Sequence, residues 1–296
     1  MKKLILAFIL IIAVSGITSF GQEDIISVDE IGVSVDCEDF SIDGGVEILV
    51  NNMTTELDYT VTAVGIGGFN PVMAVVQEDG LADCADDSRE ANNFAADLPT
   101  TGFVEAQNRN PSIRFRNNVG GDEADVSIVV GGFENSFGEF LVIIEGMSVG
   151  EFDLEGDVFS ILMTNNILAT EFPPTVYAVS VTGGLDPVIY LVDDDNAELF
   201  DVNDEMIYCD DAGFEEICWG DSVPLDGYYV SRSFNRQLTT FEYDSMLGYD
   251  LFDPEVNDHV NYRVGSYLGN TFGDYVVVFH IKFADPDAEP EATETP

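Results

Sequence analysis

Basic side chains are scarce in this 296-residue chain. It has 10 lysines and arginines against 56 aspartates and glutamates, which gives a net charge of −46 at pH 7. A surface this acidic repels nucleic acid and anionic membranes and attracts divalent cations. Binding to nucleic acid is therefore excluded. Disorder is a poor explanation for the composition, because Val, Ile, Leu and aromatic residues are plentiful enough to build a core.

Histidine is scarcer still, and this removes most familiar catalytic arrangements. Only His259 and His280 are present, so a Ser-His-Asp relay has few candidates. His280 lies in an apolar run typical of a strand, and His259 lies in an acidic loop where a surface position is favoured over a metal ligand. A carboxylate pair for glycoside hydrolysis stays open, but 56 acids do not single one out. No catalytic residue is predicted, and the protein is expected not to be an enzyme.

Long apolar runs are absent except at the N-terminus. Lys2 and Lys3 precede the apolar residues 4–14, and Ser19-Phe20-Gly21 gives a small-x-small cleavage pattern. The run is shorter than the roughly 20 residues that span a bilayer, and this layout is typical of a secretory signal peptide. We expect a secreted protein, extracellular or at the cell surface, with no membrane insertion after signal removal.

One pattern occurs twice along the chain. Residues 59–65 (YTVTAVG) match residues 177–183 (YAVSVTG), and residues 135–144 (NSFGEFLVII) match residues 270–279 (NTFGDYVVVF) without a gap. Further matches in the same order join 71–76 to 187–192, Cys84 to Cys209, Gly102 to Gly227 and 108–109 to 235–236. This spacing is far longer than the roughly 20–50 residues of solenoid repeats. It predicts two tandem domains.

Strand patterns dominate both copies. Tyr59, Val61 and Ala63 alternate with Thr60 and Thr62, and this period of two predicts a strand with one buried face and one wet face. Residues 140–144 and 275–279 are instead continuously apolar, which predicts strands covered on both faces. Glycine, asparagine and aspartate punctuate the strands at short intervals. The fold class predicted is all-β, with two tandem antiparallel β-sandwich, jelly-roll-like domains.

Composition sets the expected boundaries. The signal peptide covers residues 1–21, and the two sandwich domains cover residues 22–147 and 158–283. Residues 148–157 are acidic and glycine-containing, which suits a short linker. Residues 284–296 alternate acids with proline and small residues, and we expect them to form a disordered acidic tail.

Four cysteines in an exported chain predict disulfide bonds. Cys209 and Cys218 are close enough in sequence to staple the acidic loop between them, which leaves Cys37 to pair with Cys84. The pairings Cys37–Cys84 and Cys209–Cys218 are therefore favoured among the three connectivities. Free thiols in a reducing setting are the alternative.

Clusters of acids at strand ends are the candidate metal ligands. Calcium binds six to eight oxygens in flexible geometry, and loops with several carboxylates supply them. The sequence has no EF-hand pattern, so solvated acidic turns compete with a calcium site. The candidate ligands are Asp86, Asp87, Asp193, Asp194, Asp195, Asp210 and Asp211.

Aromatic residues near the second acid cluster are the candidate ligand-binding residues. Trp219 is the sole tryptophan, and Tyr228 and Tyr229 follow it closely. An exposed aromatic platform stacks on sugar rings, whereas packing against the neighbouring disulfide is the structural alternative.

Short motifs in both copies resemble the bacterial pre-peptidase C-terminal domain. In that family an aspartate-proline precedes a strand, a double aspartate follows, and a glycine-aromatic strand closes the domain. The second copy carries Asp186-Pro187, Asp210-Asp211 and Gly273-Asp274-Tyr275, and the first carries Asn70-Pro71, Asp86-Asp87 and Gly138-Glu139-Phe140. The resemblance implies a compact, often calcium-bound sandwich that accompanies secreted enzymes or surface proteins without catalysing a reaction. The cysteines depart from the family pattern.

These features predict a non-catalytic protein for binding or assembly at the bacterial cell surface or in the extracellular matrix. Its partner would be an extracellular glycan or protein, or a second copy of the chain. A carbohydrate-binding or carbohydrate-active protein and a structural subunit of a surface layer or filament are the alternatives. Calcium is the only cofactor expected.

Overall fold

β-Strands make up most of the chain that the computed structural model describes. Twenty β-strands and one 3₁₀ turn, η2 (Phe133–Asn135), occur in the described residues, and every strand pair is antiparallel. This confirms the predicted all-β class. The described residues are 26–29, 32–54, 57–78, 80, 82–88, 95–99, 101–107, 109–117, 123–147, 161–165, 175–181, 184–193, 197–200, 206–211, 228–231, 236–239, 244–247, 260–267, 271 and 273–283.

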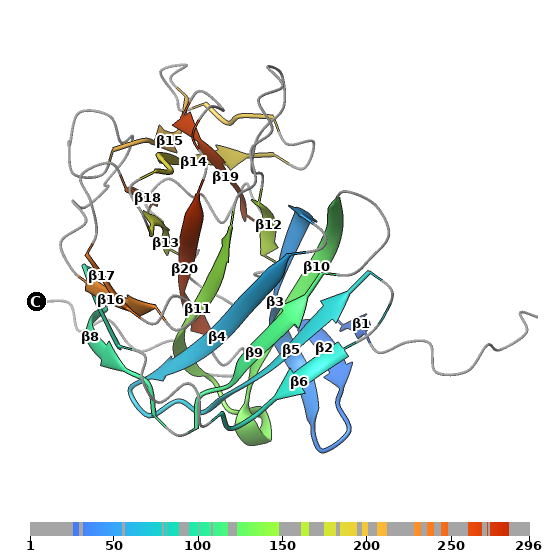
Figure 1. The fold of residues 1–296 in the computed structure, drawn as a ribbon. Helices are drawn as coiled ribbons and strands as arrows, with labels where there is room; N and C mark the ends of the chain where they lie inside the picture. The colour runs from blue at the N-terminus through green and yellow to red at the C-terminus, as the bar shows by residue number, and fades with distance from the viewer. Residues whose placement is uncertain are drawn as a thin grey trace, which may run out of the picture.

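The strands form three sheets (Figure 1). The first runs in the order β15 (Tyr208–Cys209), β14 (Pro187–Val192), β19 (Val260–Ser266), β12 (Ile161–Asn165), β3 (Ser41–Thr54), β10 (Glu123–Gly132), β5 (Pro71–Gln77) and β6 (Ala82–Ala85), with β2 (Gly32–Asp36) on β3 and β1 (Ile26–Asp29) on β2. The second runs β18 (Ser245–Leu247), β13 (Thr175–Ser180), β20 (Asp274–Phe283), β11 (Gly138–Met147), β4 (Asp58–Ile66) and β9 (Ser112–Arg116). The third runs β17 (Arg236–Thr239), β16 (Tyr228–Ser231), β7 (Ala95–Leu98) and β8 (Gly102–Glu105).

Both large sheets continue from the first half of the chain into the second. β3 pairs with β12 in the first sheet, and β11 pairs with β20 over its full length in the second, where Figure 1 shows them side by side. The sequence matches make β4, β5, β6 and β11 the counterparts of β13, β14, β15 and β20. If β3, β9 and β10 are likewise taken as the counterparts of β12, β18 and β19, the order of counterpart strands in each large sheet is the same when it is followed from either edge. The predicted domain boundaries stay predictions, since the linker lies outside the described residues.

The core belongs to both halves of the chain. The largest cluster of buried apolar residues contains Val61 and Ile128 from the first half together with Tyr177 and Val264 from the second. Side chains of the third sheet, such as Leu98, join the same cluster. Because successive strand residues point to opposite faces and residues 140–144 are all buried, β11 is covered on both faces, as its apolar run predicts.

The threonine face of β4 departs from the expectation. The alternation predicts that Thr60 and Thr62 face water, but they are only 4% and 2% exposed. Thr62 shares a hydrogen bond of 2.8 Å with the hydroxyl of Ser112 in the neighbouring strand β9. A buried hydroxyl is tolerated when it has such a partner, so a polar residue here does not mark a wet face.

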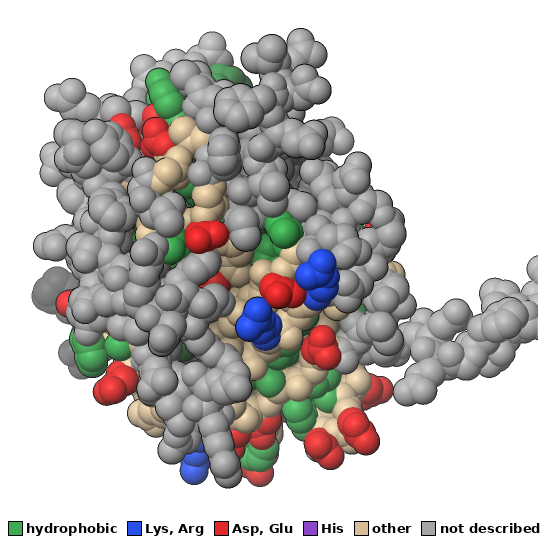
Figure 2. All heavy atoms as spheres, in the orientation of Figure 1, with side chains coloured by type: hydrophobic (Ala, Val, Ile, Leu, Met, Phe, Trp, Pro, Cys, Tyr) green, Lys and Arg blue, Asp and Glu red, His purple; other side chains and the backbone are tan. Residues whose placement is uncertain are grey.

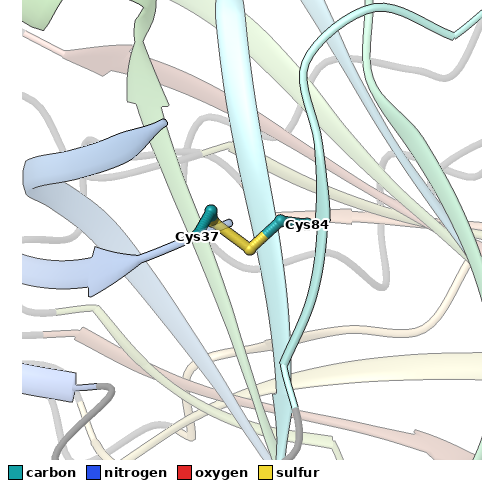
Figure 3. The surroundings of a disulfide bond; sticks show 2 residues. All are labelled: Cys37 and Cys84. Atoms are coloured by element: carbon teal, nitrogen blue, oxygen red, sulfur yellow. A yellow bond between two sulfur atoms is a disulfide. The ribbon is translucent and has the colours of Figure 1, made fainter. Parts of the chain in front are cut away.

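A disulfide bond closes the N-terminal strands over the first sheet (Figure 3). Cys37 follows β2 and bonds to Cys84 in β6, as the sequence predicts. Both cysteines pack against a second, smaller core that includes Val35, Ile42 and Val76. The bond therefore ties β2 to the far edge of the sheet.

Replacing both Cys37 and Cys84 with serine is expected to lower the free energy of unfolding by roughly 2–4 kcal/mol, because the bond closes a loop with a sequence separation of 47 residues. Urea unfolding at equilibrium, followed by circular dichroism, measures this. The paired control is Ser41→Ala, an exposed change on β3 that is expected to have little effect. Equal stability of the cysteine variant and the wild type would contradict the prediction.

Acidic side chains lie scattered over the described surface of the face in Figure 2. The carboxylate of Asp58 forms ion pairs with Arg114 at 3.2 Å and with Arg116 at 3.7 Å. Among the described residues, no helix is long and apolar enough to cross a membrane.

Candidate acidic metal site

Two paired strands in the second half of the chain bring three aspartates together. Asp186 immediately precedes β14, and Asp210 and Asp211 immediately follow β15. The strands are antiparallel, with Ile189 opposite Cys209, so the start of β14 lies beside the end of β15. Pairing of these strands therefore places carboxylates from two distant segments at one corner of the first sheet.

The three carboxylates are close enough to share one ion. Among the described residues, Asp186, Asp210 and Asp211 form the one group of at least three potential metal-ligating side chains, and their ligand oxygens all lie within 4.8 Å of one another. Asp210 is only 6% exposed, and the other two are half-buried. We call this group the aspartate trio.

Hydrogen bonds fix the backbone of the trio. The hydroxyl of Ser245, in β18, is directed at the carbonyl oxygens of Pro187 and Asp210. The backbone N–H of Asp186 donates to the hydroxyl of Thr271 at 3.0 Å, and its carbonyl accepts from the N–H of Tyr267 at 2.8 Å. These contacts hold the backbone at Asp186 and at Asp210 in place.

Oδ1 of Asp186 and Oδ1 of Asp210 are buried carboxylate oxygens without a described hydrogen-bond partner. A buried polar atom without a partner costs about 1–3 kcal/mol, and more when it is charged. A ligand that accepts electron pairs from these oxygens would remove that cost.

Burial and neighbouring negative charges make Asp186 and Asp210 hard to ionise. Burial first, and then the neighbouring charges of Asp211 and Asp186, raise the pKa of Asp210 from 3.8 to about 7. The pKa of Asp186 is raised for the same reasons, first by burial and then by Asp211. Like charges this close disfavour ionisation unless a cation lies between them.

The donor set fits a hard divalent cation. Three carboxylates offer oxygen alone, which calcium and magnesium prefer to nitrogen or sulfur. Magnesium demands a near-ideal octahedron, whereas calcium accepts irregular sets of six to eight oxygens. Calcium therefore tolerates oxygens that come from two strand ends more readily than magnesium does.

The first half of the chain carries a different set at the equivalent corner. The register of β5 with β6 places Asp86 and Asp87 where Asp210 and Asp211 stand in the other half, and Asn70 where Asp186 stands. Burial and the charge of Asp87 raise the pKa of Asp86, while the guanidinium of Arg109 lowers it. This corner has one carboxylate fewer and a cationic side chain close by, so it is a weaker candidate for a metal.

The third predicted acid cluster lies elsewhere. Asp193 is exposed, and its Oδ1 accepts a hydrogen bond of 2.9 Å from the backbone N–H of Ala197. It therefore acts as a turn residue, outside the aspartate trio. Asp194 and Asp195 lie outside the described residues.

The remaining predicted site residues are described only in part. Tyr228 and Tyr229 lie in β16, where they pair with Asp97 and Ala96 of β7, and Trp219 lies outside the described residues. Cys209 is disulfide-bonded, but Cys218 also lies outside them, so the pairing Cys209–Cys218 stays a prediction.

Of the two histidines, the structure describes His280. It is buried in β20, as a strand residue, with Nε2 at 2.5 Å from Oε1 of Glu139 in the adjacent strand β11. Burial lowers its pKa, and the contact with Glu139 opposes that shift.

Sequence reasoning selected Asp210 and Asp211 but not Asp186 as candidate ligands. Asp186 stands alone before a proline and lacks the acidic neighbours that drew attention to the other positions. Pairing between the strand after Asp186 and the strand that ends at Cys209 is the signal that could have located Asp186, since it brings residue 186 beside residues 210 and 211.

Comparison of the chain with protein-family models, with curated proteins and with solved structures found no match. The resemblance to the pre-peptidase C-terminal domain therefore stays a prediction.

Proposed function

We propose that this is an exported, non-catalytic β-sandwich protein that acts in binding or assembly at the bacterial cell surface or in the extracellular matrix, and that calcium bound at the aspartate trio stabilises it. The observation that carries the proposal is the trio itself, with three ligand oxygens within 4.8 Å and the side chain of Asp210 buried. The signal-peptide pattern at residues 1–21 and the disulfide Cys37–Cys84 support export, since disulfides persist in oxidising compartments.

The extracellular setting also supports calcium as the ion. Extracellular modules bind calcium with dissociation constants of about 10⁻⁴–10⁻³ M, which a site of few carboxylates achieves. A cation here would neutralise the repulsion within the trio and coordinate the buried oxygens of Asp186 and Asp210. Its contribution would be to stability and to the fixed position of the loops that β14 and β15 carry.

Thermal unfolding with calcium, with magnesium and with a chelator tests the proposal. A ligand that binds only the folded state adds about 2.7 kcal/mol at 100 times its Kd, which for a protein of this size raises Tm by roughly 5–10 °C. We expect that rise with calcium and a much smaller one with magnesium at the same ionic strength.

Two variants locate the effect. Asp210→Asn is expected to abolish the calcium-induced rise while raising Tm in chelator, because it removes a buried charge. Asp39→Asn changes the net charge equally at an exposed position between β2 and β3 and is expected to leave the rise intact. Equal rises with calcium and magnesium, or equal losses in the two variants, would overturn the proposal.

A further inference from the structure

A pocket opens on the first half of the chain, at the end of the third sheet. The turn between β4 and β5 forms one wall, and β8 with the segment after it forms the other. Its volume is about 270 Å³, just below the roughly 300–1,000 Å³ of pockets for drug-sized ligands. It therefore admits one ring-sized group and not a whole polymer.

Glycines shape the first wall. Gly67 and Gly68 have φ angles of +64° and +97°, and a Cβ on Gly65 would lie 1.9 Å from the carbonyl oxygen of Phe69. The turn closes with a hydrogen bond of 3.1 Å from the N–H of Phe69 to the carbonyl of Ile66. Only glycine suits these positions, and the turn leaves space above its backbone.

Amides line the pocket in a fixed arrangement. Asn110 is 3% exposed, and its Oδ1 accepts a hydrogen bond of 2.6 Å from the backbone N–H of Gln107. Asn70 also lines the pocket, and its Oδ1 is buried without a described partner. A ligand hydroxyl would satisfy that oxygen.

An exposed aromatic ring and two opposite charges complete the lining. Phe103 is 59% exposed, so a ligand in the pocket can reach its side chain. Glu105 and Arg109 are exposed residues of the same pocket. The pocket thus combines an apolar face with hydrogen-bond donors and acceptors.

We propose that this pocket binds one sugar ring at the end of a neutral extracellular glycan. A sugar ring presents an apolar C–H face that stacks on Phe103 and a rim of hydroxyls that pair with Asn70, Glu105 and Arg109. The net charge of −46 disfavours anionic glycans and acidic peptides. The inference rests on the proposed binding role, and it moves that role from the predicted Trp219 to a site in the other half of the chain.

Titration calorimetry of the mature protein against neutral tetrasaccharides of glucose, mannose and N-acetylglucosamine tests the pocket. We expect saturable binding to at least one of them and none to a polygalacturonate oligomer. Phe103→Ala is expected to weaken the binding about tenfold. Phe200→Ala removes a similarly exposed ring, 53% exposed, from the other half of the chain and is expected to change the affinity less than twofold.

The outcomes separate the two proposals. Because Phe103 is exposed, its variant is expected to keep the wild-type Tm, so weaker binding reports on the pocket. No saturable binding to any tetrasaccharide, or equal weakening by Phe103→Ala and Phe200→Ala, overturns the pocket while a calcium-induced rise in Tm leaves the aspartate trio standing. Glycan binding by Asp210→Asn, without a calcium response in the wild type, supports the pocket and overturns the trio.

Discussion

Ile144→Asp in β11 is expected to unfold both halves of the protein together. Ile144 is fully buried and pairs with Val61 in β4 on one side and Val277 in β20 on the other. An unpaired charge in such a position costs several kcal/mol. That is most of the roughly 5–15 kcal/mol by which a domain is stable.

The joint loss follows from the shared sheets. β11 and β20 are neighbours over ten register positions, from Gly138 opposite Phe283 to Met147 opposite Asp274, and one buried cluster spans both halves. Neither half keeps a covered core when β11 and β20 separate. Calorimetry of the wild type should accordingly give a single transition with equal calorimetric and van't Hoff enthalpies.

Urea unfolding and hydrogen exchange measure the effect of Ile144→Asp. We expect amides of β4 and of β13 to lose protection together. The control is Phe200→Asp, which adds the same charge at an exposed apolar residue and is expected to change stability by less than about 0.5 kcal/mol. A variant in which β13 stays protected while β4 exchanges would show that the halves fold separately.

The sequence was sufficient to predict the fold class and the two central strands β11 and β20. It did not predict that these strands pair and join the two halves. Continuous apolar runs at 140–144 and 275–279 predicted strands covered on both faces, and these strands form the centre of the second sheet. Backbone hydrogen bonds between segments distant in sequence make the pairing between them, and residue type does not record which strands those bonds join.

The expectation that the threonines of β4 face water was wrong for a related reason. Alternation identifies one apolar face but does not reveal whether the polar face is covered. Thr62 is buried because Ser112 completes its hydrogen bond, and such a partner, 50 residues away in sequence, is set by strand order.

The candidate site could be predicted in part. Adjacent acids marked residues 210 and 211, whereas Asp186 joins them only through strand pairing. The pocket at Phe103 was missed, because an isolated phenylalanine in a strand pattern normally indicates a core residue. Only its 59% exposure beside Asn70 and Arg109 distinguishes it.

In the absence of divalent cations, the stability of the wild type relative to Asp210→Asn is expected to fall as pH rises from 4 to 7. The pKa of Asp210 is raised in the folded protein from 3.8 to about 7, so the folded state binds the proton more tightly than the unfolded state does. That stability is complete below about pH 4 and is lost as pH rises through 7. At 1.36 kcal/mol per pKa unit, the loss is about 4 kcal/mol.

Calcium reverses this dependence. The ion binds the ionised carboxylate, so binding releases a proton below pH 7 and the apparent affinity should weaken by up to about tenfold for each pH unit below it. Urea unfolding in chelator at several pH values, beside calcium titrations at pH 6 and 8, measures both effects, and Asp39→Asn should match the wild type. Because asparagine does not titrate, Asp210→Asn removes this part of the dependence of stability on pH. Parallel stability profiles for the wild type and Asp210→Asn would mean that Asp210 ionises freely, and the buried carboxylate would then lose its role as the pH-sensitive ligand of the trio.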